Sequence, residues 1–266
     1  MTIELPYKPK IQEITTDALS DFYATISQII NFYQESLMIY SITRDSILPK
    51  SIPKRVGKAN GYREFSIPEI QIKERNDFHS GIYPVRLFQN TIVNIASCYE
   101  IYIRELAEEI YRYNEDLLKN SEKQFTTEEI FAFSSMKDLK EELINRSVTK
   151  LIMSNYPNLV NKYESRFHIG IHSSKSPVTL FEVHHFLEVR NIIVHNEGHA
   201  SKLFFERLKN YFELSPLNIK KPNDSPELNF EYLNKFKDKL IVLAEFIDNQ
   251  AMQKWQTTKF EHKNNG

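Results

Sequence analysis

Apolar residues recur at intervals of three and four along most of this chain, the spacing that places side chains on one face of an α-helix. The pattern predicts helices over these stretches: 15–42, 84–119, 126–153 (as one or two shorter helices), 177–196, 200–214 and 228–256. The 266 residues include only six glycines, so a fold with many strands and tight turns is disfavoured. The sequence therefore predicts an all-α protein.

Residues suited to helix ends support these boundaries. Thr15 or Thr16 can cap the first helix, and Pro84 suits the first turn of the second. The sequence TTEE at 126–129 has the form of a capping box. Gly198 is suited to end the helix that precedes it.

Two segments, residues 47–82 and 154–177, break the helical pattern with prolines and glycines and are expected to be irregular. The first segment carries a basic run formed by Lys50, Lys54, Arg55, Lys58 and Arg63. This run is either a solvated loop or an arm that contacts phosphates.

Composition narrows the class of protein. Apolar residues make up 41% and charged residues 26%, and the formal net charge of −1 means that nucleic-acid binding needs a local basic patch. The single cysteine, Cys98, excludes an internal disulfide and a thiolate zinc site and suits a reducing compartment. The first residues lack the apolar run of a signal peptide, and no stretch reaches the ~20 apolar residues of a membrane span. We therefore expect a cytoplasmic protein without membrane partners.

A carboxylate interrupts an apolar row of the second helix. Steps of three and four align Val93, Ala96, Glu100, Ile103 and Ala107. Glu100 is therefore expected to face a core or an interface, where an unpaired carboxylate is costly. It needs a cation or hydrogen-bond donors, and Arg190 is a candidate partner.

The sequence EVRNIIVHNEG, at residues 188–198, places polar residues on an otherwise apolar helix. At about 100° per residue, with Arg190 set to zero, the other polar side chains occupy a strip about 60° wide. This polar seam consists of His184, Glu188, Asn191 and His195. A solvent-facing side is wider and richer in lysine, so the seam indicates a polar cleft or a subunit contact. Arg190 flanks the seam, within reach of its long side chain.

These side chains suit metal-independent cleavage of RNA, in which the 2′-hydroxyl attacks the adjacent phosphate. A neutral imidazole can transfer a proton near pH 7. A guanidinium offers fixed donors to a phosphate that gains charge, and an amide can orient an oxygen. Two other Arg–His pairs, Arg75–His79 and Arg166–His172, lack the helical context of 190–195.

The segment RNIIVHN, after an apolar helix and before Glu-Gly, resembles the motif of the HEPN superfamily (higher eukaryotes and prokaryotes nucleotide-binding domains). Ribonucleases of that family carry Arg-x4–6-His, commonly with Asn after the Arg. Tyr99-Glu100 is similar to an aromatic–Glu pair in an early helix of HEPN proteins from bacterial defence and toxin loci. The likeness covers about residues 84–256. It implies a HEPN-type helical bundle there, with inserted loops. The chain adds an N-terminal helix and basic loop at 1–83, which exceed a minimal HEPN domain and are expected to pack on the bundle, and a polar tail at 257–266.

The resemblance also implies a homodimer in which two Arg–His motifs form one composite ribonuclease site. Arg190 is expected to stabilise the phosphate, Asn191 to position it, and His195 to transfer a proton or bind the phosphate. The products implied are 2′,3′-cyclic phosphate and 5′-hydroxyl ends. Supporting residues are Glu188, His184, Glu100 and Asn196, and the expected RNA contacts are Lys54, Arg55, Lys58 and Lys202.

No cofactor is implied, and the substrate is tRNA or mRNA. The activity implied is that of a toxin or anti-phage effector, controlled by an antitoxin or an ATPase partner. The chain departs from one branch of the family, whose motif extends to His-x-Tyr, because His195 is followed here by Asn196 and Glu197. Control by adenylylation of that tyrosine is therefore not expected.

Two other functions remain open. One is metal binding, since six of the eight histidines fall between residues 168 and 199 and Glu182-x-x-His185 is half of a di-iron helix motif. The second half and an HExxH sequence are missing. The other is a HEPN bundle that only binds RNA or a partner. A cleavage assay in EDTA separates these functions from the ribonuclease, because only the metal-independent ribonuclease predicts cleavage that survives EDTA and requires Arg190 and His195.

Overall fold

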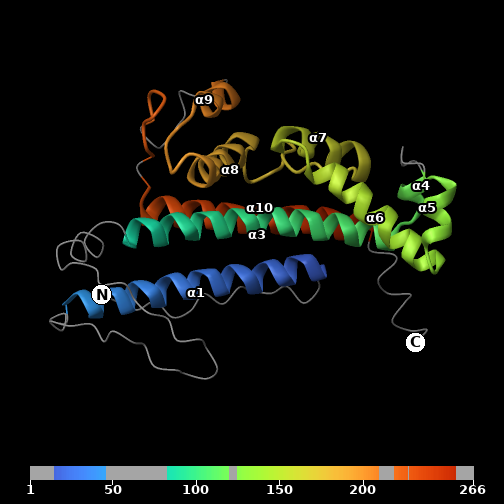
Figure 1. The fold of residues 1–266 in the computed structure, drawn as a ribbon, viewed down its shortest axis with the longest axis horizontal. Helices are drawn as coiled ribbons and strands as arrows, with labels where there is room; N and C mark the ends of the chain where they lie inside the picture. Colours follow the sequence, from blue (N-terminus) through green and yellow to red (C-terminus); the bar gives the residue numbers. More distant parts are fainter. Residues whose placement is uncertain (1–14, 46–82, 120–124, 210–218, 227, 256–266) are drawn as a thin grey trace. The chain divides into compact units, whose positions relative to one another are not determined.

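The computed structural model describes residues 15–45, 83–119, 125–209, 219–226 and 228–255. Every long regular element in these ranges is an α-helix and none is a strand, which confirms the all-α prediction. The helices, shown in Figure 1, are α1 (Asp17–Asp45), α3 (Tyr83–Tyr113), α4 (Asp116–Lys119), α5 (Thr127–Ala132), α6 (Met136–Ile152), α7 (Tyr156–Phe167), α8 (Leu180–His195), α9 (Lys202–Leu208) and α10 (Phe230–Trp255).

The chain divides into two compact units, and the boundaries near residues 26 and 92 lie inside α1 and α3. Residues 1–7 and 27–92 belong to the smaller unit, and residues 8–26 and 93–266 belong to the larger one.

Aromatic pairs hold the described part of the smaller unit together. Tyr33 of α1 meets Phe88 of α3 edge to face, with 6.1 Å between ring centroids. About two helical turns further along α1, Tyr40 stacks on Tyr83, with 5.4 Å between ring centroids. The offset aromatic geometry adds to the apolar area that both helices bury.

In the larger unit, α3 and α10 run side by side (Figure 1) and supply much of the core. The hydroxyl of Tyr102 in α3 donates to the carbonyl of Ala244 in α10 at 2.9 Å. The first turns of α1 pack on this pair, where the ring of Phe22 lies 5.3 Å from that of Tyr102. The side chains with no exposed surface here include Ile95, Leu106, Leu240 and Leu243.

The N-terminus of α1 is held by two carboxylates. The hydroxyl of Thr16 accepts the backbone N–H of Leu19 at 3.1 Å, which confirms the predicted cap. The same hydroxyl donates to Asp248 of α10. The N–H of Ala18 donates to Glu109 of α3 at 2.6 Å. Negative charge suits this position because the first N–H groups of a helix lack partners within the helix.

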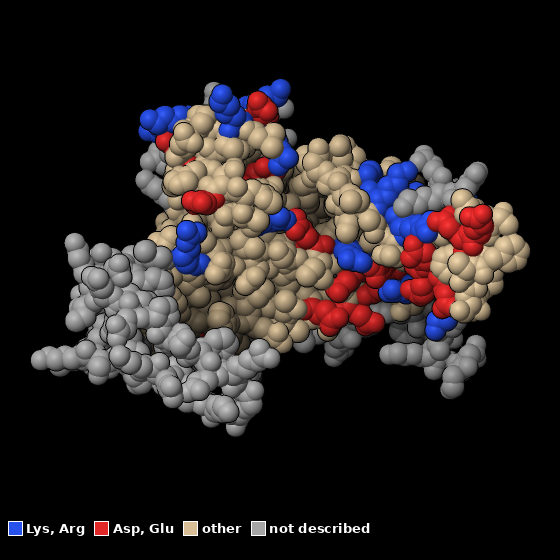
Figure 2. Space-filling view, in the orientation of Figure 1, with Lys and Arg blue, Asp and Glu red and all other residues tan. Residues whose placement is uncertain are grey.

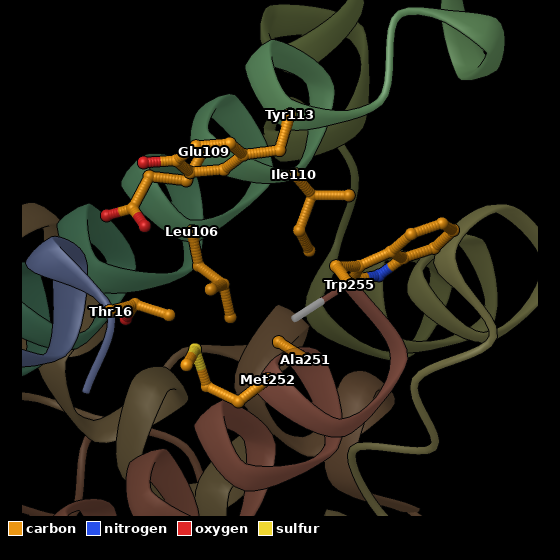
Figure 3. Close-up of a pocket in the computed structure, with 8 residues that line it drawn as sticks. All are labelled: Thr16, Leu106, Glu109, Ile110, Tyr113, Ala251, Met252 and Trp255. Carbon is orange, nitrogen blue, oxygen red and sulfur yellow. The ribbon is translucent and has the colours of Figure 1, made fainter. Parts of the chain in front are cut away.

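A small cavity lies beside this N-terminus, between α3 and the last turns of α10 (Figure 3). Its volume is about 20 Å³, and its lining is mostly apolar, including Leu106, Ile110, Ala251 and Trp255. A space of this size holds about one water molecule. The cavity is therefore a packing feature rather than a ligand site.

The expectation that 154–177 is irregular is wrong for its first half, which forms α7. Asn155 caps this helix by accepting the N–H of Asn158 at 3.0 Å. Pro157 lies in the first turn, where the missing N–H has no partner to lose. Pro157, which suggested a break in the helical pattern, thus lies at the start of a helix. The helix buries one face, formed by Tyr156, Leu159, Val160, Tyr163 and Phe167.

Several predicted helix ends are confirmed. The capping box at 126–129 is present at the start of α5, and residues 126–153 hold two helices, α5 and α6. A second capping box, formed by Thr179 and Glu182, begins α8. Gly198 follows the end of α8 with a φ of 87°, and its N–H bonds to the carbonyl of Ile192 at 2.9 Å. No described helix is both long enough and apolar enough to cross a membrane.

Candidate functional site

Helix α8 lies in the interior of the larger unit. It packs against α7, α9 and α10, and residues 183–189 are all buried. Phe186 stacks on Phe236 of α10, with 4.8 Å between ring centroids. A helix that is buried on most of its surface must find partners for each of its polar side chains. The contacts of the polar seam of α8 therefore determine what its side chains can do.

Glu188 is the centre of these contacts. Its side chain is 8% exposed, and Nη1 of Arg207 lies 3.1 and 3.2 Å from its two carboxylate oxygens. Nε2 of His184 lies 3.7 Å from the same carboxylate, and Nδ2 of Asn191 donates to it at 3.2 Å. Three of the four seam residues thus meet in one cluster, which we call the Glu188 cluster and which also includes Arg207.

The charge of Glu188 is stabilised despite its burial. Burial alone would raise the pKa of this carboxyl group. The hydrogen bond and charge of His184, together with Arg207, outweigh burial and hold the pKa of Glu188 below its ordinary value. An ionised Glu188 fixes the orientation of the Asn191 amide, because the amide nitrogen is the end that donates to the carboxylate.

Arg207 was not among the residues predicted from the sequence. It comes from α9, which buries Phe204 and Leu208 and leaves Arg207 at the edge of that buried face, 43% exposed. A buried carboxylate on α8 without a lysine or arginine one turn away was a signal that a further partner must come from elsewhere. The packing of α9 on α8 decides which cation that is.

Arg190 points to a different part of the unit. Its guanidinium forms an ion pair with Glu100 of α3, which confirms the predicted partnership. Glu100 itself is 48% exposed, so of the two expected surroundings the core is wrong and the interface stays a prediction. Glu100 lines a cleft together with Arg190, whose side chain is 18% exposed. Burial raises the pKa of Glu100 and Arg190 opposes that rise.

His195 is the last residue of α8 and is exposed. Asn196 caps the helix end, with its backbone N–H bonded to the carbonyl of Ile192 at 3.0 Å. Since α8 is continuous, Arg190 and His195 diverge by about 140° around its axis. No hydrogen bond within the described ranges links Arg190 to Asn191 or His195. One copy of the motif therefore does not converge on a single point in this conformation.

A basic surface lies beside the exposed end of α8. Figure 2 shows several lysine and arginine side chains, with acidic side chains among them, in the region of α9. The exposed cations of α9 and of the loop 219–226 are Lys202, Arg207, Lys209, Lys220 and Lys221. Backbone hydrogen bonds of 2.9 Å from Ala200 to Asp224 and from Asn223 to Ala200 hold that loop next to the start of α9. Of the predicted RNA contacts, Lys202 is part of this surface. Lys54, Arg55 and Lys58 lie outside the described residues.

The remaining histidines of the crowded segment have structural surroundings. His185 is buried against Phe181, Phe204 and Phe236, and burial lowers its pKa to about 4, with a smaller effect from His184. Such an imidazole stays neutral at pH 7.

The half motif Glu182-x-x-His185 is also engaged elsewhere. Glu182 serves the α8 capping box and forms an ion pair with Lys239 of α10. In the part of the chain that the structure describes, no three His, Cys, Asp or Glu side chains gather in a way that could hold a metal ion.

Comparison of the chain with models of protein families, with curated proteins and with solved structures finds no match.

Proposed function

We propose that this chain is a metal-independent endoribonuclease of the HEPN type, acting through Arg190, Asn191 and His195. The observation that carries the proposal is the Glu188 cluster. A buried, ionised carboxylate orients Asn191 one turn below the exposed His195, on a helix that is otherwise apolar. Such a costly arrangement is unusual on a helix that only packs.

The chemistry requires three roles. His195 at the solvent-exposed helix end accepts or donates the proton of the 2′-hydroxyl or leaving oxygen. Asn191 orients a phosphate oxygen, and Arg190 neutralises the charge that the phosphate gains. The basic surface of α9 and the loop 219–226 supplies contacts to the RNA backbone. The products are a 2′,3′-cyclic phosphate and a 5′-hydroxyl.

The divergence of Arg190 and His195 supports a composite site. Because they point about 140° apart on one helix, a site that contains both side chains is best formed by Arg190 of one copy and His195 of a second copy of the chain. Two exposed apolar side chains beside the basic surface, Val194 and Leu203, each 49% exposed, are suited to a contact between copies. As in the family that the motif resembles, a toxin or anti-phage role, with an antitoxin or ATPase as regulator, is the corresponding biological setting.

The test is cleavage of tRNA and of mRNA in the presence of EDTA. We expect the full chain to cleave, and His195→Ala and Arg190→Ala to lose about 10²-fold or more of the rate. His168→Asn, at another exposed histidine, is the matched control and should keep wild-type activity. Cleavage that EDTA abolishes, or that His195→Ala retains, would exclude this mechanism.

A mixture of subunits tests the composite site. Co-expressed Arg190→Ala and His195→Ala chains form mixed dimers that retain one Arg190 and one His195. Activity recovered only in the mixture is expected, whereas an active monomer by mass in solution would contradict the arrangement.

A second candidate is an RNA-binding module without catalysis. The ion pair of Arg190 with Glu100 favours it, because a guanidinium held there is not directed at the seam. RNA binding by the basic surface without cleavage under any of the conditions above would identify this function.

A further inference from the structure

A cleft of about 350 Å³ opens beside Arg190, between α3, α7, α8 and the segment after α6. This volume lies at the lower end of the ~300–1,000 Å³ typical of small-molecule sites. Its apolar walls include Ile103, Ile152, Leu159 and Leu187. Apolar walls with a few polar groups at one side are the usual character of a site for a flat, partly apolar ligand.

Arg190 has hydrogen-bonding capacity left over at this cleft. A guanidinium carries five N–H donors, and Glu100 accepts from one of its nitrogens. The Nε of Arg190 is buried and has no hydrogen-bond partner among the described residues. A small movement of this side chain toward an incoming phosphate would satisfy donors that are now unused.

A second cation, Lys162, is bonded to a residue that lines the cleft. Ser154, which lines it, donates its hydroxyl to the carbonyl of Leu151 at 2.8 Å. The same hydroxyl accepts a hydrogen bond from Lys162 of α7, whose ammonium also donates to the carbonyl of Lys150 at 3.0 Å. The charged side chains that line the cleft are Arg190 and Glu100, and Lys162, through its bond to Ser154, adds a positive charge next to the lining, which suits an anionic ligand.

Glu100 determines which anion fits best. If Arg190 turns to a phosphate, Glu100 loses its counter-charge at a site where it is only half exposed. Hydrogen-bond donors on the ligand would then replace that counter-charge. Among the four RNA bases, guanine alone presents two adjacent N–H donors on one edge, and a carboxylate accepts two such donors side by side.

We propose that the cleft is a guanosine subsite, in which Glu100 accepts the base edge, the apolar walls enclose the ring and Arg190 takes the phosphate. This inference rests on the proposed function in that RNA supplies the nucleotide, and it adds a base preference that the ribonuclease motif does not contain.

The experiment is calorimetric titration of the full chain with the 3′-monophosphates of guanosine, adenosine, cytidine and uridine. We expect guanosine to bind about tenfold more tightly or better, the discrimination expected of one bidentate pair. Glu100→Gln should bring the four affinities together, and Arg190→Ala should weaken all four alike. Ile152→Trp fills the cleft without altering a charge and should abolish binding. Glu128→Gln, an exposed glutamate of α5, is the matched control.

RNA and free nucleotide are distinguished with 2′-O-methyl oligonucleotides, UUGUU and UUUUU, and with GTP. Tighter binding of UUGUU supports the proposal, whereas GTP binding without this preference overturns the assignment to RNA. Equal affinities for the four monophosphates, or no binding of any, overturn the subsite itself. Guanosine preference in a chain that does not cleave RNA would leave the subsite standing and refute the ribonuclease. Cleavage without guanosine bias would support the ribonuclease and refute the guanosine subsite.

Discussion

Removal of Arg207 tests the physical basis of the candidate site most directly. Arg207→Ala deletes two charge-assisted contacts of 3.1 and 3.2 Å to Glu188 and leaves that carboxylate 8% exposed with only His184 and Asn191. Removing one partner of a fully buried ion pair costs about 3–5 kcal/mol. Arg207 is 43% exposed, so solvent screening reduces the value, and we expect about 1–3 kcal/mol at pH 7.

The loss should depend on pH in a defined direction. The pKa of Glu188 is below its ordinary value of 4.5 in the folded chain, so its contribution to stability is present above pH 4.5 and is lost as pH falls through the folded value. Arg207→Ala removes the charge and hydrogen bonds of Arg207, so the pKa of Glu188 rises relative to the wild type. The difference in unfolding free energy between variant and wild type should therefore shrink as the pH is lowered from 7 to about 3.

The assay is urea denaturation followed by circular dichroism at several pH values. Lys202→Ala removes an exposed cation from the same helix and should change the unfolding free energy by less than about 0.5 kcal/mol. Glu188→Gln with Arg207→Ala should cost less than the sum of the two single changes. An Arg207→Ala chain as stable as the Lys202→Ala chain, or a loss that does not vary with pH, would refute the reasoning.

The other predictions concern acid sensitivity and RNA affinity. Burial lowers the pKa of His185 from its ordinary 6.5 to about 4 in the folded chain, so between these pH values only the unfolded chain binds the proton, and stability falls as the pH drops. His185→Leu should reduce the loss of unfolding free energy between pH 7 and pH 4 by roughly 2–3 kcal/mol, measured by denaturation at both values. An unchanged loss would contradict the burial argument. Lys202→Ala, Lys220→Ala and Lys221→Ala should each lower the salt dependence of binding to single-stranded RNA, by about 0.7 in the log–log slope, whereas Lys137→Ala on α6 should leave it unchanged. Equal slopes in all four variants would place the RNA elsewhere.

The polar seam could be predicted from the sequence because helical periodicity is a local property. Once residues 180–195 form a helix, the positions of His184, Glu188 and Asn191 on one strip are fixed by about 100° per residue. The partnership of Arg190 with Glu100 also came from a general rule, that a carboxylate in an apolar row requires a cation.

The features that could not be predicted from the sequence depend on tertiary packing. Nothing local distinguishes Arg207 from the other cations of its segment, and only the docking of α9 on α8 brings it to Glu188. The same holds for Glu100, whose row of neighbours is apolar but whose own position lies at an open cleft. For α7 the signal was present, in Asn155 before Pro157, but a proline at a helix start and a proline that breaks a helix differ only in the conformation of the residues around them.

The hydrogen bonds between Thr16 and Asp248 affect the order in which the protein can fold during its synthesis. They join positions separated by 232 residues, so α1 cannot complete its contacts in the larger unit until α10 has left the ribosome. The same late helix supplies Phe236, against which Phe186 of α8 stacks. A nascent chain therefore carries the Arg190–His195 segment before it has the support that positions it. Chains truncated before α10 therefore lack this support for the Arg190–His195 segment.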